Sequence, residues 1–125
     1  IFKGGDYMLE KLNYDRNLLL KVIEIEQENF NERIKRTKDK FNIIGYNRID
    51  IDRWVEDEFV LFMDELVKVL QELTNFQIYK EIKTEEFEDF DIMNSCSKFR
   101  IIECRLSLGR KDFELTRIGT KNRIR

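Results

Sequence analysis

The sequence WVEDEFVLFMDELVKVLQEL, at residues 54–73, decides the expected fold, because its apolar pattern and its length both indicate one long helix. Apolar residues recur there at intervals of four and three positions, which places them on one helical face. That face consists of Val55, Phe59, Phe62, Leu66, Val69 and Leu73, and it is widened by Trp54, Leu61, Met63, Val67 and Leu70. A helix with so broad an apolar surface needs cover on more than one side, so we expect both a second helix and a sheet to pack against it.

The two ends of this helix are also marked in the sequence. Asp50 or Asp52 can cap the free amides at its start, and the acids at 56–58 suit the positive end of the helix dipole. Thr74-Asn75 is a polar pair that ends it. With the apolar faces covered, only the acidic start at residues 50–58 is left free for a partner.

A first helix is predicted at residues 9–41, with a possible break near residues 13–17, and the two helices form an antiparallel hairpin. Residues 42–51 connect them, and Gly45 suits a helix C-cap. This connection also contains the apolar residues Ile43, Ile44, Tyr46 and Ile49. We expect them to fold back over the end of the hairpin; the alternative is an exposed patch for a partner.

After residue 75 the pattern changes to the two-residue period of strands. Strands are predicted at residues 76–83, 99–108 and 112–118, with a hairpin turn at Gly109-Arg110-Lys111. In the second strand the core side is predicted to hold Ile102, Cys104, Leu106 and Leu108. The fold class is therefore α+β: an antiparallel helical hairpin packed on a three-stranded antiparallel meander, in the order α-α-β-β-β.

Two segments have no firm structural prediction. Residues 85–91, EEFEDFD, fit a strand extension, a short helix or an acidic loop, and the basic tail at 121–125 is too short and polar to fold alone. Residues 1–7 are interpreted as a translated leader or non-native segment, because Lys3-Gly4-Gly5-Asp6 is what a purine-rich bacterial ribosome-binding sequence encodes in frame and Met8 follows. Residues 8–125 then form a single domain of bacterial or phage origin.

The composition argues against catalysis. The chain has no histidine, its five glycines are scattered, and its two cysteines are too few for a disulfide framework, so histidine-based sites and phosphate loops are excluded and no cofactor or metal is expected. Glu81-Ile82-Lys83 and Glu103-Cys104-Arg105 share the acid-x-basic pattern of some metal-dependent nucleases, but such a pattern arises readily by chance when 38% of residues are charged. Cys104 is expected in the core and Cys96 at the surface.

Charge is distributed unevenly along the chain. From residue 95 onward nine Lys or Arg stand against three acids, so the net charge of -2 conceals an acidic first part and a basic last part. The leading hypothesis is a non-enzymatic inhibitor from a phage or mobile element, of the anti-CRISPR type, whose acidic surface binds a host nucleic-acid enzyme or defence system in place of phosphates. The predicted acidic surface consists of Asp50, Asp52, Glu56, Asp57, Glu58, Glu85, Glu86, Glu88, Asp89 and Asp91.

The alternative hypothesis is a nucleic-acid-binding accessory protein that contacts phosphates through its basic strands and tail. The predicted basic surface consists of Arg100, Arg105, Arg110, Lys111, Arg117, Lys121, Arg123 and Arg125. A helical-hairpin homodimer with a structural role is the third option. No run of 18 apolar residues, signal peptide or lipidation site is found, so we expect a cytoplasmic protein with no membrane partner.

Overall fold

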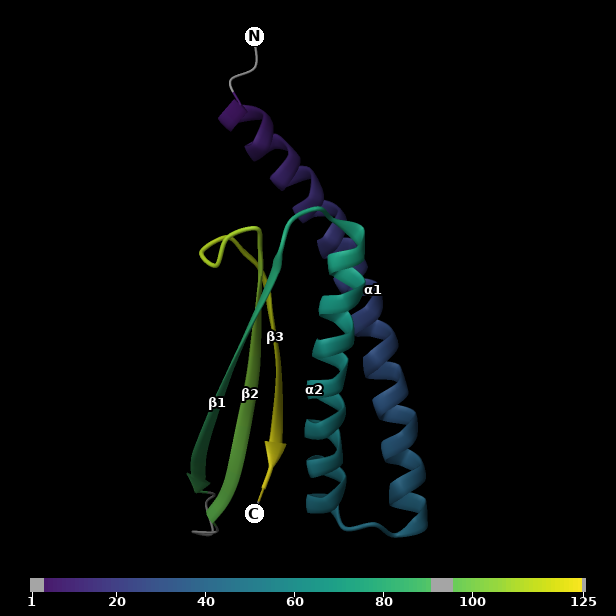
Figure 1. Cartoon of the computed structure of the whole chain (residues 1–125). Helices are drawn as coiled ribbons and strands as arrows, with labels where there is room; N and C mark the ends of the chain where they lie inside the picture. The colour runs from purple at the N-terminus through teal and green to yellow at the C-terminus, as the bar shows by residue number, and fades with distance from the viewer. Residues whose placement is uncertain (1–3, 91–95, 125) are drawn as a thin grey trace.

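Two helices precede a three-stranded antiparallel sheet in the computed structural model, which describes residues 4–90 and 96–124. The elements are α1 (Gly4–Ile44), α2 (Arg48–Leu73), β1 (Ile78–Phe90), β2 (Cys96–Leu108) and β3 (Glu114–Arg123). Both helices lie on the same side of the sheet, so its other face is uncovered by any described helix (Figure 1). The predicted α+β class and the element order are confirmed.

Contacts at two levels along the helical hairpin join α1 to α2. The rings of Phe30 and Phe62 stack with their centroids 4.3 Å apart. Near the end of α2, the Thr74 hydroxyl donates a hydrogen bond of 2.8 Å to Asp15. Asp15 is buried and also accepts a hydrogen bond from Lys11. Helix α1 continues unbroken through residues 13–17, so the break considered there is absent. The turns of α1 that precede Asp15 extend past the end of α2 (Figure 1).

The connection between the helices is only three residues long. Gly45 has a positive φ of 96°, and Tyr46 N donates to Phe41 O at 3.0 Å, which is the helix C-cap predicted for this glycine. Asn47 caps α2, its side-chain oxygen accepting from Ile49 N at 2.8 Å. The predicted caps at Asp50 and Asp52 are therefore wrong, because α2 begins before both of them.

The apolar residues of this connection do not fold back over the hairpin. The side chains of Ile43, Ile44 and Tyr46 are 86%, 71% and 56% exposed, and only Ile49 is partly buried. A connection of three residues, 45–47, is too short to reach back over the helix ends. The expectation of a covered tip is wrong, and the exposed patch that was considered as its alternative is what the structure has.

The core lies between the hairpin and the central strand. The β2 residues Ile102, Cys104, Leu106 and Leu108 are buried as predicted, and they meet buried residues of both helices, including Leu19, Ile23, Phe59, Met63, Leu66 and Leu70. The cover of α2 is incomplete, since Leu61 and Leu73 are 57% and 47% exposed. The prediction that both apolar faces of this helix are occupied therefore holds for most of the helix and fails at these two residues.

The sheet is longer than the sequence pattern indicates. Strand β1 pairs with β2 without a break from Ile78↔Leu108 to Phe90↔Cys96, so the acidic segment is a strand extension as far as residue 90. Strand β3 continues to Arg123, and Ile124 N donates to Lys98 O at 2.8 Å. Described residues of the basic tail thus belong to the sheet, because pairing with β2 satisfies backbone groups that a free tail would leave to solvent.

Candidate protein-binding surface

The acidic residues at the start of α2 divide into exposed and buried members. Asp50 and Asp57 are exposed, and Glu58 is partly buried in an ion pair with α1. Asp52 and Glu56 are only 7% and 5% exposed. These two positions are four residues apart, so they share a helical face, and that face packs towards the sheet. The exposed acidic surface predicted at the start of α2 therefore lacks two of its members.

Glu56 belongs to a partly buried ion pair that joins α2 to the sheet. Its Oε1 accepts a hydrogen bond of 3.0 Å from Nη1 of Arg100, whose Nη2 donates at 3.0 Å to Glu86 of β1. The bond to Glu86 is the main cause of the raised pKa of Arg100. Oε2 of Glu56 is buried without a hydrogen-bond partner among the described residues. Arg100 is thus a structural bridge, and it compensates a carboxylate that would be costly to bury alone.

The acidic half of β1 is exposed at each of its carboxylates. Glu85, Glu88 and Asp89 are exposed and have no ion-pair partner within the described residues, whereas Glu86 is held by Arg100. Of the predicted acidic residues, Asp91 lies outside the described part of the chain. Because alternate residues of a strand point to opposite faces, these acids carry negative charge to both sides of the strand.

The arginines of the predicted basic surface are mostly paired with carboxylates. The pairs are Arg105–Glu114 at 3.1 Å, Arg110–Asp112 at 3.0 Å, Arg117–Glu114 at 2.6 Å and Arg117–Glu103 at 3.4 Å. The hydrogen bond between Arg117 and Glu114 lowers the pKa of the carboxyl and raises that of the guanidinium. Arg123 ends β3, and Arg125 lies outside the described residues. Positive charge on this surface is therefore largely neutralised by the sheet itself.

The lysines of the basic surface lie over aromatic rings. Nζ of Lys121 is 5.1 Å from the ring centroid of Phe87 and 4.9 Å from that of Phe99. The two rings are stacked with centroids 5.5 Å apart, and Lys111 lies 5.9 Å from the ring of Tyr79. Sequence reasoning missed this aromatic pair. The only signal for it is the strand register, which places Phe87 opposite Phe99 and which the sequence does not contain.

An apolar depression of about 210 Å³ lies at the hairpin tip. It is lined by Phe41, Tyr46, Asp50, Ile51 and Trp54. The Phe41 ring meets the Tyr46 and Trp54 rings edge-on, with centroid distances of 5.2 and 5.0 Å. Together with the exposed isoleucines of the connection, this depression gives the tip an apolar character that differs from the charged sheet.

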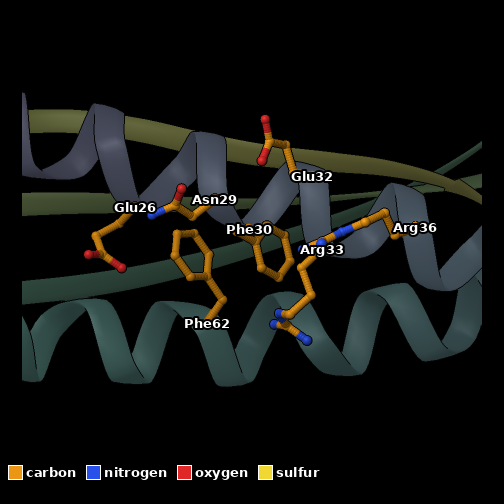
Figure 2. Close-up of a pocket in the computed structure, with 7 residues that line it drawn as sticks. All are labelled: Glu26, Asn29, Phe30, Glu32, Arg33, Arg36 and Phe62. Carbon is orange, nitrogen blue, oxygen red and sulfur yellow. The ribbon is translucent and has the colours of Figure 1, made fainter.

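A larger depression of about 390 Å³ lies on the open side of the helical hairpin (Figure 2). Its lining residues are Glu26, Asn29, Phe30, Glu32, Arg33, Arg36 and Phe62. The stacked rings of Phe30 and Phe62 form its floor, and Arg33 lies 5.4 Å from the Phe30 ring while bonding Glu58 at 3.0 Å. Two acids and two arginines balance one another, and the aromatic floor belongs to the helix packing.

The thiols and the acid-x-basic pairs show no activated geometry. Cys104 is buried, and burial raises the pKa of its thiol to about 11, so it stays protonated at neutral pH. Cys96 is exposed, as expected. Glu103 is held by Arg117, and among residues 4–90 and 96–124 no cluster of three or more acids or thiols is placed to hold a metal ion. Within the same residues, no helix has an apolar stretch long enough to cross a membrane.

Comparison of this chain with protein-family models, with curated proteins and with solved structures found no match. Its function is therefore argued from its own surface, on which Glu85, Glu88 and Asp89 of β1 are exposed carboxylates without ion-pair partners among the described residues.

Proposed function

We propose that this chain is a non-enzymatic binding protein whose acidic strand β1 engages a basic surface of another protein. The observation that carries the proposal is the state of the acids in β1: Glu85, Glu88 and Asp89 are exposed and unpaired within the described residues, on a strand that pairs with β2 along its whole length. Charges that are fixed and unpaired attract a partner of opposite sign and steer its approach.

The class of partner follows from the chemistry of the strand. A row of carboxylates on a rigid strand can occupy a basic groove that otherwise takes the phosphates of nucleic acid. We therefore extend the proposal to a nucleic-acid-handling enzyme as the target and to inhibition as the outcome. Origin in a phage or mobile element stays a prediction from the sequence.

The experiment measures binding of a fluorescein-labelled decapeptide of alternating lysine and threonine, used as a basic protein probe. The triple variant Glu85→Gln, Glu88→Gln, Asp89→Asn is expected to weaken binding about tenfold, because each exposed charge contributes roughly 0.5 kcal/mol and about 1.4 kcal/mol corresponds to a factor of ten. Binding should also weaken as salt rises.

The matched control is Glu24→Gln, Glu28→Gln, Asp39→Asn in α1, which removes the same charges from exposed residues elsewhere. This control should bind the probe as the unchanged protein does, apart from the small effect of net charge. An equal loss of affinity in both triple variants would contradict a specific role for β1.

A second candidate function, nucleic-acid binding, is favoured by one observation. The stacked pair Phe87 and Phe99 lies beside Lys121 on a sheet, and aromatic rings with adjacent cations can stack and hold unpaired bases. The neutralised arginines of the same sheet weigh against it. A labelled single-stranded oligonucleotide tests it directly: tight binding that is lost in Lys121→Ala would favour this candidate over the first.

A further inference from the structure

Strand β1 is an edge of the sheet, and its hydrogen bonds to β2 show which residues direct their backbone N–H and C=O groups away from β2. Gln77 O accepts a hydrogen bond of 2.7 Å from Gly109 N, directly opposite, and the register then runs without a shift to residue 90. In an antiparallel pair, residues alternate between bonding the neighbouring strand and pointing away from it. Odd-numbered residues of β1 therefore bond β2. The residues that direct N–H and C=O groups to the free edge are Ile78, Lys80, Ile82, Thr84, Glu86, Glu88 and Phe90.

The free edge of β1 is uncovered over most of its length. From Lys80 to Glu86 every residue is exposed, and in the described part of the chain no strand pairs with this edge. Natural edge strands are usually protected by shortness, proline, bulges or lysine. Strand β1 has 13 residues, contains no proline and has no register shift. One of its two lysines, Lys80, is held in an ion pair by Asp64 of α2.

The protection that remains is negative charge, and it is selective. Strand β1 carries five carboxylates against two lysines. A second copy of β1 that paired acidic half with acidic half, residues 85–89, would place carboxylates opposite carboxylates, which is unfavourable for directly opposed residues. A basic strand would place opposite charges together along the same edge. Over residues 85–89 the charges of the edge thus disfavour a second copy and favour an extended segment of positive charge.

We propose that β1 accepts an extended basic segment of a partner protein as a fourth strand of the sheet, through the outward backbone groups of Ile82, Thr84, Glu86 and Glu88. This inference rests on the proposed function and adds its mode: the main chain holds the segment, and the acids select its charge. The partner's basic side chains alternate between the two sides of the strand, as the acids of β1 do.

Hydrogen exchange provides the direct measurement. In the free protein the amides of Ile82, Thr84 and Glu86 should exchange much faster than those of Glu81, Lys83 and Glu85, which β2 protects. Saturation with the lysine-threonine decapeptide should slow the even-numbered amides at least tenfold and leave the odd-numbered ones unchanged. A decapeptide N-methylated at alternate residues lacks half of its donors and serves as the control probe, with binding at least tenfold weaker.

The variant Thr84→Pro tests the same point from the protein side. It removes one outward N–H without removing a bond to β2. An edge strand tolerates proline at such a position, where the N–H points away from the neighbouring strand. Thr84→Val keeps the N–H and is the matched control. We expect probe affinity to fall about tenfold in Thr84→Pro and to be unchanged in Thr84→Val, with unchanged far-UV circular dichroism in both.

Each outcome separates this inference from the proposed function. If the acid-neutralising triple variant weakens binding but the even-numbered amides keep exchanging fast, the acids act alone and strand addition is wrong. If neither the triple variant nor Thr84→Pro weakens binding, the proposed function fails as well. Slow even-numbered amides without any peptide, together with a doubled mass in sedimentation, would make a second copy the occupant and overturn the proposal.

Discussion

Strands β1 and β2 each have 13 residues and pair along their whole length, yet they differ in burial and in charge. In β2 the residues from Ile102 to Leu108 that face the helices are buried, whereas in β1 only Ile78 is buried and Ile82, four positions on, is 39% exposed. The central strand has a neighbour on both sides and the helical hairpin over one face; the edge strand has one neighbour and is exposed from Lys80 to Glu86. Stability is therefore concentrated in β2, and β1 is the strand for which we propose a role in recognition.

The largest difference between the two strands should appear on truncation of facing residues. Leu106→Ala in β2 removes a fully buried side chain and should lower the free energy of unfolding by about 2–5 kcal/mol. Ile82→Ala in β1 removes a side chain that is 39% exposed and should cost less than about 1 kcal/mol. Urea denaturation of both variants measures the two values. Equal losses in the free energy of unfolding would contradict the expectation that β2 contributes more to stability than β1.

A smaller effect is expected at the bridge between the two strands. Arg100→Gln leaves the carboxylate of Glu56 buried without its cation and should cost about 1–3 kcal/mol. Arg110→Gln breaks an ion pair whose side chains are 73% and 71% exposed, and should cost less than about 0.5 kcal/mol.

Thermal and urea unfolding of these two variants give the comparison, and the double variant Arg100→Gln, Glu56→Gln should recover part of the loss because no charge is then left buried. A cost at Arg100 no greater than that at Arg110 would show that the bridge is not structural.

The smallest effect concerns the two thiols of β2. Cys96 at the exposed end should react with Ellman's reagent, whereas Cys104 should react only after unfolding, so one thiol per folded molecule is expected at pH 8. Cys96→Ser is the control and should show no fast reaction.

Because burial raises the pKa of Cys104 to about 11, its contribution to stability is complete below the unfolded-state value of about 8.5. It is lost as pH rises through the folded value of about 11. A Cys104→Ala variant should therefore lose less stability than the unchanged protein between these limits. Fast reaction of both thiols at pH 8 would contradict the buried position.

Local sequence pattern was sufficient for the elements and for the core. The four-and-three spacing of apolar residues identified α2, and the alternation from Ile102 to Leu108 identified the buried face of β2. Each pattern follows from the backbone, because the helix and strand periods decide which side chains share a face. The ends of elements were less accurate. Asn47 rather than an aspartate caps α2, and β3 continues into the basic tail, since hydrogen bonding to a neighbour decides where a strand stops.

The candidate site was predictable in its composition and not in its geometry. The acids of residues 85–91 were identified as a group, but their place on an edge strand was one of three possibilities. The burial of Glu56 and the pairing of Arg117 could not be foreseen, since both depend on residues far away in the chain.

Charge and periodicity along the chain are properties of neighbours in sequence, and they were enough to specify two helices, three strands and an acidic and a basic part. Which carboxylates stay free for a partner depends on contacts between residues separated by many positions, such as Arg100 with Glu56 across 44 residues. Only the packing of the hairpin on the sheet makes those contacts, and it leaves Glu85, Glu88 and Asp89 of the edge strand β1 without ion-pair partners among the described residues.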